Sequence, residues 1–131
     1  VQERSIEQVH ICLGMPGLRH TAPERYAAFL LNTALGGGMS SRLFQEVREK
    51  RGRAYSVYSF LSSYRDTGYL GVYAATSPEW VEEVLKVVRD ELLKVAADGL
   101  GESELTRVKN QLKGNLLLGL ETSDSQMNRI A

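Results

Sequence analysis

Two side chains that can bind the oxygen atoms of a peptide, Arg48 and Tyr55, lie seven residues apart. A guanidinium group binds carboxylate or carbonyl oxygens through a planar set of donors, and a phenol hydroxyl can donate to a developing oxyanion. Gly52 lies between them and favours a tight turn after a helix, so the two side chains are expected on neighbouring elements. A plainer interpretation, which the residues alone favour, pairs Arg48 with a surface glutamate and packs Tyr55 in a sheet.

Neither the glycine run nor the serines near these residues match a known catalytic pattern. The run Gly36–Gly38 precedes a predicted helix but lacks the Lys and Ser or Thr that follow the glycines of a P-loop. We interpret it as a helix end and a hinge. The serines, Ser40, Ser41, Ser56 and Ser59, lie outside any nucleophile-elbow pattern, so capping and strand-face roles are expected.

The side chains able to bind a soft metal ion are His10, Cys12 and His20. His10 and Cys12 share one face of a predicted strand, but no second ligand pair accompanies them. The helical zinc motifs His-x-x-Glu-His and His-Glu-x-x-His are also absent from the sequence. We therefore expect a strand histidine, a small buried cysteine and no metal site in this chain.

The elements that would position Arg48 and Tyr55 follow from hydrophobic spacing and capping residues. Strands are expected at 9–13, 54–62 and 68–76, and the last two form an antiparallel hairpin. Helices are expected from Thr21, with Glu24 at capping-box spacing; from Ser40 or Ser41 to Gly52, with Arg42 on the exposed face; from Ser77-Pro78 to Asp98; from Ser103; and from Gln126. This order predicts an α+β fold, with a mainly antiparallel sheet covered on one face by helices.

The totals narrow the possible classes of protein. A chain of 131 residues suits a single domain, and 16 basic residues balance 16 acidic ones. This balance argues against a nucleic acid or an anionic membrane as a partner. No apolar run is long enough to span a membrane, and a soluble protein of a bacterial cytoplasm or an organelle matrix is compatible with the composition.

The sequence LGGGMSSRLFQEVREKRG at 35–52, followed by AYSV at 54–57, resembles the signature of the pitrilysin and mitochondrial processing peptidase family of zinc peptidases. The match is to the second, non-zinc-binding domain of the repeated pair in that family. Further support comes from Leu30-Leu31-Asn32 and from 115–131. The resemblance covers almost the whole chain, and it is most specific over 36–57.

The resemblance implies that residues 1–131 are a single-domain fragment, the C-terminal-type half of a processing-peptidase-like protein. Zinc would be bound by a homologous partner half, on the same longer chain or on a separate subunit. The two halves would close around an unfolded peptide. Arg48 would grip the peptide near the scissile bond, and Tyr55 would hydrogen-bond the carbonyl or the tetrahedral oxyanion.

The sequence departs from the family pattern in two ways that limit these expectations. The zinc motif is absent, so the chain should be inactive alone. Arg53 stands where the family usually has an apolar residue, which places a charge near Tyr55. The expected function is the substrate-clamping half of a zinc metalloendopeptidase. The alternatives are a non-catalytic structural or core subunit of the same family, and an isolated peptide-binding module.

Overall fold

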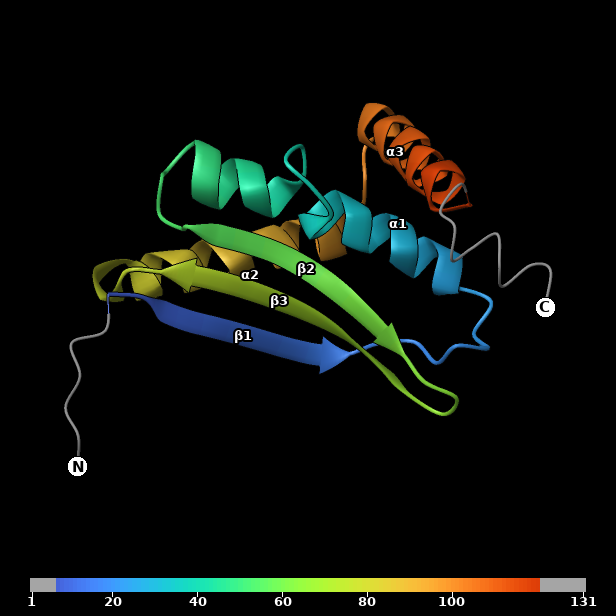
Figure 1. Cartoon of the computed structure of the whole chain (residues 1–131), viewed down its shortest axis with the longest axis horizontal. Coiled ribbons are helices and arrows are strands. Elements are labelled where there is room, and N and C mark those ends of the chain that lie inside the picture. The colour runs from blue at the N-terminus through green and yellow to red at the C-terminus, as the bar shows by residue number, and fades with distance from the viewer. Residues whose placement is uncertain (1–6, 121–131) are drawn as a thin grey trace.

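A computed structural model describes residues 7–120 as one antiparallel sheet with helices on one face. Figure 1 shows the strands in front and the helices behind and above them. The elements in chain order are β1 (Val9–Pro16), α1 (Arg25–Gly36), η1 (Phe44–Glu49), β2 (Ser56–Ser63), β3 (Gly68–Thr76), η2 (Pro78–Trp80), α2 (Val81–Asp98) and α3 (Glu102–Leu120). The predicted α+β class is confirmed. The helix expected near Gln126 lies outside the described residues.

The sheet has the order β1-β3-β2, with β3 in the centre. Both pairings are antiparallel, and β2 and β3 form the predicted hairpin. The bounds of β3 are as predicted, whereas β2 begins two residues later than expected and β1 continues to Pro16. Val57 of β2 and Val72 and Ala74 of β3 are buried on the side of the sheet that faces the helices, where they form the core with η1 and α2.

Helix α1 differs from the prediction at its start and in its apolar stripe. Its N-cap is Glu24, which makes no side-chain capping bond, so the capping box expected from Thr21 is wrong. Leu35 is fully buried, but Tyr26 and Phe29 are 62% and 42% exposed. The described residues therefore cover only part of the apolar stripe of α1.

The short helix before Gly52 is a π-helix rather than an α-helix. The amide of Lys50 donates to the carbonyl of Gln45, five residues back, at 2.9 Å. Val47 is fully buried on its inner side. Ser41 was expected as a possible cap, but its hydroxyl donates to the carbonyl of Gly38 instead. Such wide turns are rare and occur often at functional sites.

The hairpin leads into the longest helices as predicted, with one shift. Ser77 is the N-cap and Pro78 the first residue of η2, which continues into α2. Gly99 ends α2 with a φ of 70°. Helix α3 begins at Glu102, before the expected cap Ser103, because the carbonyl of Gly101 accepts the first helical bond.

Arg42 was expected on a solvated face, and this prediction is wrong. Its guanidinium group donates to both carboxylate oxygens of Glu104, at 2.8 and 2.6 Å, and to the carbonyl of Gly99 at 3.4 Å. Glu91, which is 5% exposed, lies 4.0 Å away and also binds Lys94. The Arg42 hydrogen bonds hold the pKa of Glu104 below its ordinary value. One cation thus joins the residues before η1 to both α2 and α3.

We expect Glu104→Gln to lower the free energy of unfolding by about 2 kcal/mol near neutral pH, because Arg42 would lose a charge-assisted, two-pronged partner. Since the folded-state pKa of Glu104 is lowered, its contribution is present above the unfolded pKa and is lost as the pH falls through the folded pKa. The difference between wild type and variant should therefore shrink below about pH 4.

Urea unfolding at a series of pH values measures this difference. Glu102→Gln, on the exposed first turn of α3, is the matched control and should have a much smaller effect. Equal stability of Glu104→Gln and wild type at pH 7 would show that the Arg42 interactions contribute nothing net.

Candidate functional site

The segment between Arg48 and Tyr55 is fixed by backbone hydrogen bonds. The amide of Gly52 donates to the carbonyl of Arg48 at 2.9 Å, and the amide of Arg53 donates to that of Val47 at 3.0 Å. Gly52 has a φ of 60°, which favours glycine. The amide of Tyr55 then donates to the carbonyl of Ala75 at 2.8 Å, which attaches the segment to β3. The predicted tight turn is therefore present.

Arg48 is exposed and lies on the aromatic ring of its own helix neighbour. The carbon of its guanidinium group is 5.0 Å from the ring centroid of Phe44. Arg48 forms no ion pair with any residue in the described part of the chain; the nearby Glu46 instead binds Lys50 and Arg51. The plainer interpretation, in which Arg48 pairs with a surface glutamate, is wrong, and its donors face solvent.

Tyr55 also projects outward, with 54% of its surface exposed. A hydrogen bond of 3.0 Å joins its hydroxyl to Oγ of Ser77, the residue after β3. The interpretation that packs Tyr55 in the sheet is wrong, because only its backbone pairs with β3. No hydrogen bond joins Tyr55 to Arg48: the first binds Ser77, and the second lies on Phe44.

Arg53 does not direct its charge at Tyr55. Its guanidinium carbon lies 3.5 Å from the ring centroid of Trp80, and its Nε is 3.1 Å from a carboxylate oxygen of Glu83. Its carbonyl accepts a hydrogen bond from the hydroxyl of Thr76. The charge of Arg53 is therefore bound by Trp80 of η2 and Glu83 of α2.

The remaining candidates have structural partners. A hydrogen bond of 2.7 Å joins Nδ1 of His10 to the hydroxyl of Tyr73. Cys12 is exposed, so its predicted burial is wrong: it lies on the open face of β1. Within residues 7–120 no group of three or more His, Cys, Asp and Glu side chains could hold a metal ion. Ser59 donates to the carbonyl of Asn32, as expected of a strand-face residue.

The glycine run lines a shallow pocket of about 390 Å³ with Met39, Phe44, Val57, Tyr58 and Ser59. A side chain at Gly36 would place its Cβ 2.2 Å from the amide nitrogen of Ser59, so glycine is required by the close approach of α1 to β2. The run does end one helix, as predicted. Phe44, on which Arg48 rests, forms part of this pocket.

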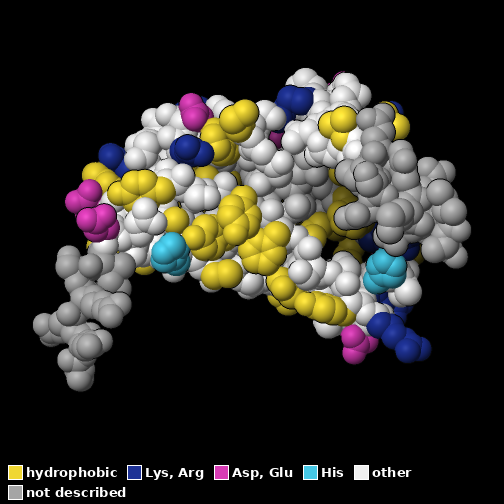
Figure 2. Space-filling model, in the orientation of Figure 1, with side chains coloured by type: hydrophobic (Ala, Val, Ile, Leu, Met, Phe, Trp, Pro, Cys, Tyr) yellow, Lys and Arg dark blue, Asp and Glu magenta, His cyan; other side chains and the backbone are white. Residues whose placement is uncertain are grey.

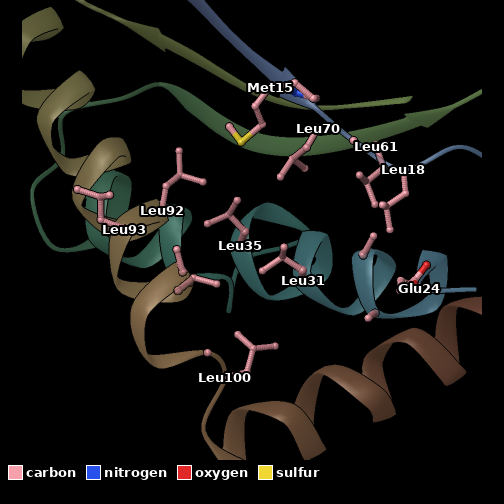
Figure 3. Close-up of a pocket in the computed structure, with 17 residues that line it drawn as sticks. Met15, Leu18, Glu24, Leu31, Leu35, Leu61, Leu70, Leu92, Leu93 and Leu100 are labelled. Atoms are coloured by element: carbon pink, nitrogen blue, oxygen red, sulfur yellow. The ribbon is translucent and has the colours of Figure 1, made fainter. Parts of the chain in front are cut away.

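A larger groove of about 780 Å³ lies between α1, α2 and the helix-facing side of the sheet. Figure 3 shows leucines from all three converging on it, among them Leu31, Leu70 and Leu92. Among the described residues that line it, Glu24 is the only ionisable one. The groove offers apolar surface and lacks a group for peptide chemistry.

The neighbours that orient the two candidate side chains were not predicted from the sequence. Phe44 supports Arg48, and Ser77 binds Tyr55. Phe44 stands four residues before Arg48, a spacing that places them on one helical face. The sequence predicted Ser77 only as a helix cap, because its hydrogen bond to Tyr55 spans 22 residues of sequence.

The fold is that of peptidase domains of the inactive type, and the match to one family is direct. The chain belongs to the family described as the peptidase M16 inactive domain, which residues 1–112 match. The structure is similar to that of a peptidase M16 inactive domain from Pseudomonas fluorescens, with a TM-score of 0.83 and 32% identity over 93% of this chain and 28% of that one. The resemblance to the pitrilysin-type zinc peptidases is confirmed.

Two further similarities agree with this assignment. An uncharacterized zinc protease of Streptomyces coelicolor is 58% identical over 97% of this chain and 28% of its own length. A protease from Helicobacter pylori has the same fold, with a TM-score of 0.86 at 22% identity over 98% of this chain and 31% of that one. The chain thus spans less than a third of the length of each of these three relatives. Among the helices of residues 7–120, none is long and apolar enough to cross a membrane.

We expect Arg53→Met to change the fluorescence of Trp80, the single tryptophan of the chain. Removing the guanidinium group at 3.5 Å from the ring uncovers the indole and removes a cation–π contact of about 0.5–2 kcal/mol. Acrylamide quenching should become more efficient, and the emission maximum should shift. Arg51→Met, whose guanidinium binds Glu46, is the control and should leave both unchanged. Unaltered quenching in Arg53→Met would contradict the stacked arrangement.

Proposed function

We propose that this chain is the substrate-clamping half of a zinc metalloendopeptidase. The observation that carries the proposal is an exposed guanidinium with no ion-pair partner among residues 7–120, seven residues before an exposed phenol. Both lie within the stretch that matches the peptidase M16 inactive domain. In this proposal Arg48 binds a backbone carbonyl or carboxylate of an extended peptide near the scissile bond, and Tyr55 donates a hydrogen bond to the carbonyl that is attacked.

The positions of the neighbouring side chains suit these roles. Ser77 can donate to the oxygen of Tyr55, which leaves the phenol proton for the substrate. The ring of Phe44 restricts the guanidinium of Arg48 before any ligand arrives, so less side-chain entropy is lost on binding. Both groups are supported by backbone that is hydrogen-bonded at each end of the Gly52 turn.

Residues 7–120 offer no set of side chains that fits zinc. Nδ1 of His10 is engaged by Tyr73, and the described residues hold no cluster of metal ligands. In our proposal the zinc and the group that activates water belong to a homologous partner half, on the same longer chain or on a separate subunit. This chain would then be inactive alone, as residues 1–131 would form one domain of a larger protein.

The alternative of a non-catalytic structural subunit has less support. The relative that is 58% identical carries the name of a zinc protease, and a purely structural role gives no reason for Arg48 and Tyr55 to be exposed. A zinc-bearing half combined with this chain should cleave an unfolded peptide. If the combined protein cleaves none, the structural alternative is favoured.

We expect Tyr55→Phe to lower kcat/KM for peptide cleavage by about a hundredfold in the protein that combines both halves, because one oxyanion donor is lost. Steady-state cleavage of a fluorogenic unfolded peptide measures this effect. Tyr26→Phe is the matched control, since Tyr26 is similarly exposed but lies on α1. Turnover of Tyr55→Phe equal to that of the control would remove the proposed role of Tyr55.

A further inference from the structure

The face of the sheet opposite the helices carries a continuous set of aromatic rings. Figure 2 shows hydrophobic side chains gathered across the strands on this face. The rings of Tyr58 and Tyr73 are 4.9 Å apart, Tyr58 also lies 6.1 Å from Phe60, and Phe60 meets Tyr69 edge-on at 6.0 Å. Tyr64 extends the row from Tyr69 at 6.2 Å. We call these five residues the aromatic face.

The strand register explains why the rings meet. Tyr58 is paired with Tyr73. Phe60 is paired with Gly71, and Tyr69 is the next residue of β3 whose side chain lies on the same face. The absence of a side chain at Gly71 leaves room for the ring of Phe60, whose atoms would lie 2.3 Å from a Cβ there. From the Tyr58 row to the Tyr69 row the face extends over about 13 Å of strand, the length of roughly four extended residues.

The aromatic face is continuous with the candidate site. Tyr58 and Phe44 line the same shallow pocket beside the glycine run, and Phe44 carries the guanidinium of Arg48. This pocket therefore adjoins both the ring that carries Arg48 and one ring of the aromatic face.

The chemistry of the aromatic face differs from that of the leucine-lined groove. Four of its five residues are tyrosines, and Tyr58, Tyr64 and Tyr69 are 43%, 53% and 39% exposed. Tyrosine offers an apolar ring together with a hydroxyl, which suits a ligand that carries both apolar side chains and polar backbone. Permanent interfaces are instead rich in aliphatic residues, as the groove is.

We propose that the aromatic face binds apolar or aromatic side chains of the extended peptide whose backbone Arg48 and Tyr55 hold. This inference rests on the proposed function and narrows its substrate class: unfolded polypeptides with aromatic or large apolar residues several positions from the scissile bond, on the side that runs toward Tyr58. The face selects such substrates by ring stacking and by hydrogen bonds from tyrosine hydroxyls to the peptide backbone.

The test is binding of two labelled peptides to the full chain, followed by fluorescence anisotropy. One is an unfolded twelve-residue peptide with two phenylalanines, and the other has serine in their place. We expect the phenylalanine peptide to bind about tenfold more tightly, and Tyr58→Ser to remove this preference. Tyr26→Ser, on α1, should retain it. Equal affinity of wild type for both peptides, or an equal loss in Tyr26→Ser, would overturn the proposal.

Cys12 provides a second readout, because it is exposed and is paired with Tyr73, in the same row of this face as Tyr58. The phenylalanine peptide should slow alkylation of Cys12, measured by mass spectrometry in this chain and in the longer polypeptide. If Cys12 is already shielded in the longer polypeptide without peptide, another part of the protein covers the face and the proposal is wrong. If Tyr55→Phe loses activity but Tyr58→Ser keeps the phenylalanine preference, only this inference is wrong. If Tyr58→Ser loses the preference but Tyr55→Phe keeps its activity, only the oxyanion role of Tyr55 is wrong.

Discussion

The pairing of Arg42 is the interaction on which the position of the candidate site depends. A guanidinium group that is only partly exposed must be matched by acceptors, because an unpaired charge in such a place destabilises the fold by several kcal/mol. Its acceptors come from α3, from the end of α2 and from the buried Glu91 within α2. These contacts fix α2 and α3 relative to Arg42 and the other residues just before η1. Arg48 follows on η1, whose inner residue Val47 is fully buried, so the exposed site rests on a strongly constrained base.

Local signals in the sequence were enough to predict most of the elements, whereas the roles of Arg48 and Tyr55 were expected only from the family resemblance. Alternation identified β3 to the residue, and Ser77-Pro78 marked the start of the helical segment after it. The position of Arg42 could not be predicted in this way, since its partner Glu104 is 62 residues away and a charged side chain on a short helix normally faces water. The residues alone could not decide between packing and exposure of Tyr55 for the same kind of reason: a tyrosine at the start of a strand has the same local pattern whether it packs or projects.

The two apolar surfaces of the sheet illustrate how the same hydrophobic content can have different uses. On the helix-facing side, leucines line the groove and the core, where shape and volume decide packing. On the other side, cross-strand pairing places Tyr58 beside Tyr73, whose hydroxyl binds His10, and leaves the rings of Tyr58, Tyr64 and Tyr69 partly exposed. The alternation of a β-strand separates these two sets without any change in overall composition.

The direction of the Arg48 side chain depends on how many residues the π-helical turn of η1 contains, as well as on which residues they are. A π-helix holds one residue more in its hydrogen-bonded loop than an α-helix does, and each residue of an α-helix turns the chain by about 100°. Loss of one residue between Phe44 and Arg48 would remove the extra residue of the wide turn and change the angle at which the guanidinium group meets the Phe44 ring. Insertions and deletions in this segment would therefore alter the direction of Arg48 even when every remaining side chain is unchanged. The length of η1 is under its own constraint, separate from that on its composition.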